Sequence, residues 1–175
     1  MTDFRRPEPI SAEHEVASFD CGSDAQTSWL REHAVQAHRA DSARVYVTCV
    51  SETNRVAGYY ALSAGSVAHE SAPSRIAQGL GRYPVPVIIL TRLGVDQTHQ
   101  GHGLGTSLVH DALLQTAAVS ERVGVRALLI HAETPEAAAF YARISVAFVE
   151  SPTDPLHLLL LMKDLRAAIR EGAAL

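Results

Sequence analysis

The sequence predicts an α/β protein in which helices cover both faces of a mixed β-sheet. Runs rich in β-branched and apolar residues alternate along the chain with segments of helical periodicity. The best strand pattern, residues 85–95, also leads through a glycine-rich loop directly into a long apolar helical stripe that begins at Leu104. At 175 residues the chain has the length of one domain, and we expect a single domain over residues 1–175.

The N-terminal part begins with a weak pattern that becomes regular near Ser23. Residues 9–22 predict a first strand or loop that ends in a glycine turn. Ser23 or Asp24 is typical of a helix N-cap, and the apolar spacing that follows predicts one helix to about Arg39.

A hairpin and a long loop follow this helix. The alternating residues 43–50 predict a strand, and residues 56–64 predict the returning arm of the hairpin. Gly58 inside that arm indicates a bulge or a close approach of another backbone. Residues 66–83 are polar and predict a loop with a short helical piece over residues 74–80.

The second half alternates strands and helices. Its patterns predict a strand over 85–95, a helix from Leu104 ending at Gly124, a strand over 127–132, a short helix over 135–142 capped by Thr134, a last strand over 156–162, and a short helix or frayed tail over 165–175.

Composition and charge exclude several classes of function. The formal net charge of −4 argues against nucleic-acid binding driven by net charge alone, although a local basic patch could still bind it. Cys21 and Cys49 are too few for a disulfide framework, and no ligand set has zinc spacing, because His99 and His102 flank a loop. We therefore expect no metal. No membrane span or signal peptide is expected either, which points to a cytoplasmic location.

The loop between the strand and the helix predicts an anion site. It reads Gln100-Gly101-His102-Gly103-Leu104-Gly105 and is followed by Thr106. The first amides of a helix are unpaired and the helix dipole is positive there, so such an end attracts phosphate. Glycine lets a backbone come close to a phosphate because it has no Cβ. The loop is not a Walker A loop, which needs a lysine, nor a GxGxxG dinucleotide fingerprint.

This loop matches the pyrophosphate-binding signature of the GNAT superfamily of N-acetyltransferases, Gln/Arg-x-x-Gly-x-Gly/Ala, at every fixed position. A plain glycine-rich turn is the alternative for the loop taken by itself. Over most of its length, however, the chain resembles the GNAT-fold toxins of type II toxin–antitoxin modules. The matching pieces include Phe19-Asp20-Cys21-Gly22, Gly58-Tyr59-Tyr60-Ala61-Leu62, Arg92-Leu93-Gly94-Val95-Asp96, Phe140-Tyr141 and Ser151-Pro152.

The resemblance implies a fold, a reaction and partners. The fold is the GNAT fold, a mixed, mostly antiparallel central sheet flanked by helices. The cofactor is acetyl-CoA, and the reaction is acetylation of the α-amino group of aminoacyl-tRNA, which blocks translation. The expected partners are a ribbon-helix-helix antitoxin, operator DNA bound only through the antitoxin complex, and a second copy of the chain in a homodimer.

The resemblance also assigns roles to residues. The loop Gln100 to Gly105, with the amide of Thr106, would hold the pyrophosphate. The backbone of Leu93, Gly94 and Val95 would lie beside the pantetheine. Tyr141 would be the general acid, because a phenol with a pKa of about 10 is protonated at neutral pH and can protonate a thiolate whose pKa is about 8.5. The alternative is that Tyr141 only packs.

Two further groups of residues bear on the acceptor. No strong base is evident, and Asp96 and Glu133 are the nearest carboxylates in sequence. This suits an α-amine, which titrates near a pKa of about 8 and is partly neutral at physiological pH. Acceptor tRNA needs cations, and Arg75, Arg82 and Arg92 are the candidates, with Arg122, Arg126 and Lys163 as possible members of the same patch.

The segment after Tyr141 departs from the family pattern. The family places Phe-Gly-Phe two residues after its Phe-Tyr pair. Here the altered segment Ile144 to Ala147 occupies this place, and Ala147-Phe148 stands where Gly-Phe is expected, with about two extra residues before it. Two alternatives to the toxin stay open, and this departure motivates the second of them. One is a GNAT enzyme that acetylates a small amine or a protein N-terminus, and the other is a degenerate domain that only binds CoA or a partner.

Overall fold

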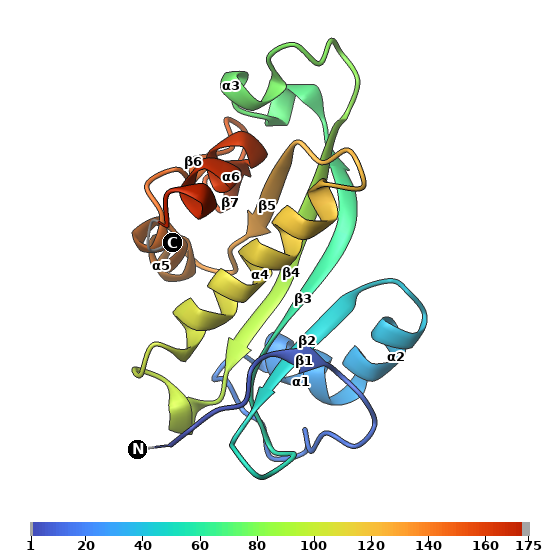
Figure 1. The fold of residues 1–175 in the computed structure, drawn as a ribbon, viewed down its shortest axis with the longest axis vertical. Helices are drawn as coiled ribbons and strands as arrows, with labels where there is room; N and C mark the ends of the chain where they lie inside the picture. Colours follow the sequence, from blue (N-terminus) through green and yellow to red (C-terminus); the bar gives the residue numbers. More distant parts are fainter. Residues whose placement is uncertain (1, 173–175) are drawn as a thin grey trace. The chain divides into compact units, whose positions relative to one another are not determined.

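The computed structural model describes residues 2–172, and its contacts divide the chain into two compact units. The N-terminal unit comprises Met1–Ser63 and Thr91–Ala112, and the C-terminal unit comprises Ala64–Leu90 and Leu113–Leu175. Three long elements run through both units (Figure 1), namely β3 Val56–Val67, β4 Val85–Val95 and α4 Leu104–Ser120. Within the described residues one mixed sheet has the strand order β1-β2-β3-β4-β5-β7-β6.

In the N-terminal unit, β1 Glu8–Pro9 and β3 both pair antiparallel with β2 Arg44–Cys49. Alternate residues of β2, including Val45 and Val47, are buried with the two helices α1 Asp24–Glu32 and α2 Ala34–Arg39. Figure 1 shows these helices beside β1 and β2.

The opposite face of the same strands meets the first half of α4. The hydroxyl of Tyr60 on β3 donates a hydrogen bond to the carboxylate of Asp111 on α4. A Cβ built on Gly58 would lie 2.8 Å from Cδ1 of Leu108 on α4 and 3.3 Å from the carbonyl oxygen of Gly94. Both alternatives predicted at Gly58 are thus confirmed, because the register of β2 with β3 also shifts beside it, between Thr48 and Cys49. Helices cover both faces of the sheet in this unit.

The prediction of one helix from Ser23 to Arg39 is wrong at His33. The N-cap is confirmed, since the Ser23 side chain accepts from the amide of Gln26. The helix nevertheless ends at His33, whose φ of −124° is not helical, and α2 starts again at Ala34. Leu30 and Ala34, on either side of the break, are both fully buried in one cluster. The apolar spacing therefore looks like that of a continuous helix although the backbone is interrupted.

In the C-terminal unit, β4 pairs parallel with β5 Ala127–His131, from Val87 opposite Ala127 to Leu90 opposite Ile130. β7 His157–Leu161 pairs antiparallel with β5, and β6 Val149–Glu150 pairs antiparallel with β7. One face of these strands is buried with α3 Ser74–Ala77. The helices α5 Pro135–Ile144 and α6 Met162–Arg170 complete the unit (Figure 1).

Several boundaries differ from the sequence predictions. The expected strand 56–64 continues to Val67, α4 ends at Ser120 before Gly124, and the two-residue strand β6 was not predicted. The tail expected from residue 165 is a helix that already starts at Met162, and residues 173–175 of that expectation lie outside the described part. Across residues 2–172, none of the helices combines the length and apolar character that crossing a bilayer requires.

Candidate functional site

The parallel ladder between β4 and β5 ends before β4 does. The last pair is Leu90 with Ile130, whereas β4 continues to Val95. On its other side β4 stays attached to β3, because the amide of Asp96 donates to the carbonyl oxygen of Ala57 at 2.8 Å. Within the described residues the edge of β4 past Leu90 thus has no strand on the β5 side, and an open edge can pair with an extended ligand.

A short turn then anchors the glycine loop to the end of β4. Asp96 caps the 3₁₀ turn Gln97–His99 through the amide of Thr98. The side-chain amide of Gln100 donates to the carbonyl oxygens of Val95 at 2.9 Å and Cys21 at 3.0 Å. The side chain of Gln100, a residue of the predicted pyrophosphate loop, thus fixes that loop on the strand.

The backbone of the loop presents free amides. The first helical hydrogen bond of α4 runs from Ser107 to the carbonyl oxygen of Gly103 at 3.0 Å. None of the amides of residues 101–106 donates to another group within residues 2–172. Gly101 and Gly103 have φ values of +79° and +82°, with open space where a Cβ would stand. Unpaired amides at the start of a long helix fit a pyrophosphate, which supports the sequence prediction for this loop.

Tyr141 lies inside α5 in the C-terminal unit. The helix is capped by Thr134, whose hydroxyl accepts from the amide of Ala137 at 3.1 Å, as the sequence predicts. The Tyr141 side chain is only 7% exposed and packs edge-on against Phe140. Burial raises the pKa of Tyr141 above its usual value, so the phenol stays protonated throughout the physiological range.

The unusual segment Ile144 to Ala147 does not disturb the helix around Tyr141. The helix α5 runs without a break to Ile144, two residues beyond the prediction. The Ser145 hydroxyl then accepts from the amide of Ala147 at 3.2 Å, and Val146 is fully exposed. The extra residues therefore form a surface turn after the helix.

The two carboxylates nearest in sequence have different surroundings. Burial alone would raise the pKa of Asp96, but hydrogen bonds from Thr98 and the amide of Asp20 outweigh it and hold the pKa below its usual value. Such a carboxylate is a poor proton acceptor. Glu133 is exposed just before α5.

The three candidate tRNA-binding arginines differ in what they contact. Arg75 forms a two-pronged ion pair with Asp164 of α6, with Nη2 at 2.8 Å from Oδ1. Arg82 is exposed, and within residues 2–172 its side chain has no hydrogen-bond or ion-pair partner. Arg92 is half-buried, with its guanidinium carbon 5.4 Å from the ring centroid of Trp29. The sequence missed this contact because the two residues lie far apart in the chain.

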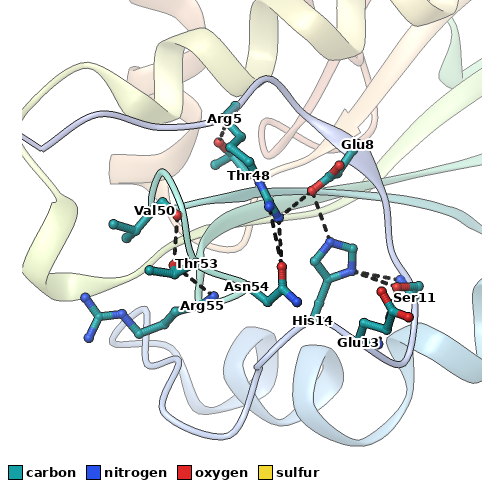
Figure 2. Close-up of polar contacts among 10 residues, drawn as sticks. All are labelled: Arg5, Glu8, Ser11, Glu13, His14, Thr48, Val50, Thr53, Asn54 and Arg55. Carbon is teal, nitrogen blue, oxygen red and sulfur yellow. Dashed lines mark hydrogen bonds and ion pairs between the residues drawn. The ribbon is translucent and has the colours of Figure 1, made fainter.

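One side-chain cluster has the composition of a metal site. Glu8, His14 and Cys49 offer ligand atoms within 4.8 Å of one another. A cation is already present, however, because Nη2 of Arg5 lies 2.7 Å from Oε1 of Glu8 (Figure 2). Nδ1 of His14 accepts from the amide of Ser11 at 2.9 Å, so the proton lies on Nε2, which faces Glu8 at 3.2 Å.

The rest of this cluster also favours an internal polar network. The guanidinium of Arg5 reaches Oδ1 of Asn54 as well (Figure 2). Burial raises the pKa of the Cys49 thiol, which keeps it protonated within this network. The cluster thus ties the N-terminal segment to β2 and the turn after it.

Comparisons with known proteins agree with this geometry. The family model described as "Acetyltransferase (GNAT) family" matches residues 9–145. A protein of Mycobacterium tuberculosis (strain ATCC 25618 / H37Rv) named tRNA-acetylating toxin is 45% identical over 169 residues, which cover 97% of this chain and 99% of that protein.

Solved structures share the fold over nearly the whole chain. AtaT complexed with acetyl-methionyl-tRNAfMet has a TM-score of 0.86 and 26% identity, covering 95% of this chain and 99% of that one. A mutant of the toxin AtaT bound to the C-terminus of the antitoxin AtaR and acetyl-CoA has a TM-score of 0.80 and 26% identity, covering 95% and 98%.

Proposed function

We propose that this chain, which belongs to the acetyltransferase (GNAT) family, transfers the acetyl group of acetyl-CoA to the α-amino group of aminoacyl-tRNA. The observation that carries the proposal is the 45% identity, over nearly the full length of both chains, to a protein named for acetylating tRNA. The likeness to AtaT bound to acetyl-methionyl-tRNAfMet supports it independently.

Residues of the N-terminal unit hold acetyl-CoA, which supplies the acetyl group as an activated thioester. The free amides of residues 101–106 receive the pyrophosphate. The open edge of β4 at Leu93, Gly94 and Val95 pairs with the pantetheine, and an amide there polarises the thioester carbonyl. Gln100 keeps the loop and the strand in register through its two hydrogen bonds.

The transfer forms a C–N bond to the acceptor amine and breaks the C–S bond of the thioester. The phenol of Tyr141 gives its proton to the departing thiolate of CoA, and the resulting phenolate takes a proton back from solvent. The amine loses its own proton to solvent. Because the pKa of Tyr141 is raised, the acid stays available over the range in which the α-amine, with a pKa of about 8, becomes neutral.

We expect the biological setting of this enzyme to resemble that of its relatives. Acetylated aminoacyl-tRNA cannot enter elongation, so the activity stops translation in the cytoplasm, where charged tRNA is used. We expect an antitoxin of the ribbon-helix-helix type to neutralise the enzyme and to carry the complex to operator DNA. The solved complex of AtaT with the antitoxin AtaR supports an antitoxin partner, and a homodimer is our expectation for the free toxin.

The test is transfer of labelled acetyl from acetyl-CoA to bulk charged tRNA by the wild type and by Tyr141→Phe. Label on aminoacyl-tRNA that falls at least a hundredfold in the mutant supports both the reaction and the acid. Undiminished transfer by the mutant removes Tyr141 from its role. No label on tRNA, with transfer to a small amine or a peptide N-terminus, favours the other GNAT activity, and CoA binding without any transfer favours a degenerate domain.

The rate should rise with pH as the α-amine deprotonates, without help from a protein base. A steep loss of rate near pH about 6 that Glu133→Gln abolishes would instead identify Glu133 as a general base.

A further inference from the structure

Trp29 stands on a rigid support in the N-terminal unit. Its indole stacks on the ring of Tyr59, with centroids 6.0 Å apart and planes inclined by 14°. The Tyr59 hydroxyl donates to the carbonyl oxygen of Gln26 at 2.7 Å, so β3 and α1 hold both rings. Tyr59 also packs edge-on against Phe19. These contacts therefore hold the indole ring of Trp29 in a fixed position.

Arg92 lies over that stack with its hydrogen-bonding capacity unused. Its guanidinium carbon is 5.4 Å from the Trp29 ring centroid, a distance at which the ring attracts the cation. No carboxylate pairs with Arg92 among residues 2–172, and none of its N–H groups donates to a protein acceptor there. A half-buried cation with five free donors and a fixed plane suits an external phosphate or carboxylate.

The position of Arg92 along β4 indicates which molecule supplies the anion. Gln100 ties the pyrophosphate loop to Val95, and Arg92 stands three residues further back along the strand, about 10 Å away. If Leu93 to Val95 lie along the pantetheine, Arg92 lies toward its acetyl end. The phosphates of CoA belong at the opposite end, beside the loop, so the anion at Arg92 comes from the acceptor.

We infer that Arg92, held in place by Trp29, binds the phosphate of the 3′-terminal nucleotide of the acceptor tRNA and so positions the α-amine for attack. This inference rests on the proposed function. Arg92 is the binding residue and Trp29 is a positioning residue, because its ring faces are used by Tyr59 and Arg92. Arg75 is not part of this contact, since Asp164 already occupies its guanidinium.

The test compares two acceptors that differ only in that phosphate. One is a 3′-aminoacyl-adenosine, and the other is the same ester with a 5′-phosphate; aminoacyl-tRNA and acetyl-CoA are titrated alongside. Arg92→Gln should raise KM about tenfold for the phosphorylated ester and for aminoacyl-tRNA. Its KM for acetyl-CoA and for the phosphate-free ester should stay at the wild-type value. Arg39→Gln, which removes an exposed charge from α2, should leave every KM near the wild type.

Trp29 variants separate positioning from folding. Trp29→Leu should raise the same two KM values as Arg92→Gln, and Trp29→Phe should restore most of the affinity because it keeps an aromatic face. An equal loss by Arg92→Gln on both esters, or a raised KM for acetyl-CoA alone, would overturn the inference while the wild type still acetylates tRNA. A wild type that never labels tRNA would overturn the proposed function itself, and this inference with it.

Discussion

The imidazole rings of His131 and His157 stack face to face across β5 and β7, with centroids 4.0 Å apart and planes inclined by 15°. They are the last register pair of the two strands, and Nε2 of His157 lies 3.4 Å from the carboxylate of Asp154. Desolvation and the neighbouring His157 lower the pKa of His131, and Asp154 opposes this only in part.

The lowered pKa makes stability depend on pH. Below the ordinary histidine pKa of about 6.5 the unfolded chain takes up a proton that the folded His131 resists, so the free energy of unfolding falls as the pH drops. His131→Phe keeps a ring against His157 without a titrating group, and its stability should fall less between pH 7 and pH 5. Denaturation in urea at each pH measures this, followed by the fluorescence of Trp29, the single tryptophan.

The comparison isolates one histidine. Burial also lowers the pKa of His38 and His110, but both residues are present in the wild type and in the variant. Parallel stability curves for the two proteins would show that the stacked pair does not couple folding to protonation.

Gln100 provides a prediction for cofactor binding. Gln100→Glu has the same shape but sets a carboxylate against the carbonyl oxygens of Val95 and Cys21, where an amide now donates. Losing these two hydrogen bonds should raise KM for acetyl-CoA about tenfold or more, with KM for aminoacyl-tRNA much less affected. Steady-state kinetics with each substrate varied in turn measures the split.

The matched control is Gln97→Glu, which adds the same charge on the exposed turn that precedes the loop. If both variants raise KM for acetyl-CoA equally, charge repulsion of the cofactor explains the result, and the anchoring role of Gln100 is refuted.

Sequence reasoning recovered the elements whose causes are local. Ser23 and Thr134 are helix caps, which depend on residues within one turn, and β4 spans the predicted residues 85–95. The glycine loop was found because its signature, with Gly101 and Gly103 at positive φ, is contiguous.

What the sequence missed depends on contacts between distant residues. The break at His33 leaves the apolar spacing of Leu30 and Ala34 intact, so periodicity cannot reveal it. The sequence alone does not distinguish Arg75, Arg82 and Arg92 as binding residues. Only the packing of Trp29 and the position of Asp164 distinguish an arginine with free donors from one already paired.

Gly58 provides a prediction for folding stability. A Cβ at this position would meet Cδ1 of the fully buried Leu108 at 2.8 Å and the backbone of Gly94 at 3.3 Å. Gly58→Ala should destabilise the protein by about 1–3 kcal/mol through overpacking. Gly124→Ala, where nothing lies within 4 Å of the new Cβ, should change stability by less than about 1 kcal/mol. Equal effects in urea denaturation would contradict the close approach of α4 to β3.

The guanidinium of Arg126 holds the loop that carries α3. Its Nε donates to the carbonyl oxygen of Ile76 at 2.9 Å, and its Nη2 donates to that of Gln78 at 3.1 Å. These carbonyl groups end a helix of one turn, where a cation is favourable and no intrahelical donor is available. Arg126 is one of the possible members of the predicted tRNA-binding patch, and its guanidinium caps this helix.

Arg126→Met keeps the apolar stem and removes the donors, so it should cost about 1–2 kcal/mol of stability and speed amide hydrogen exchange over residues 74–80. The control Arg122→Met removes an exposed arginine from the turn after α4 and should change neither quantity. Faster exchange confined to residues 74–80 distinguishes loss of this cap from general unfolding, because global destabilisation would also speed exchange in the buried strand β5. Unchanged exchange over residues 74–80 would mean that Ile76, buried against the sheet, holds α3 without the arginine.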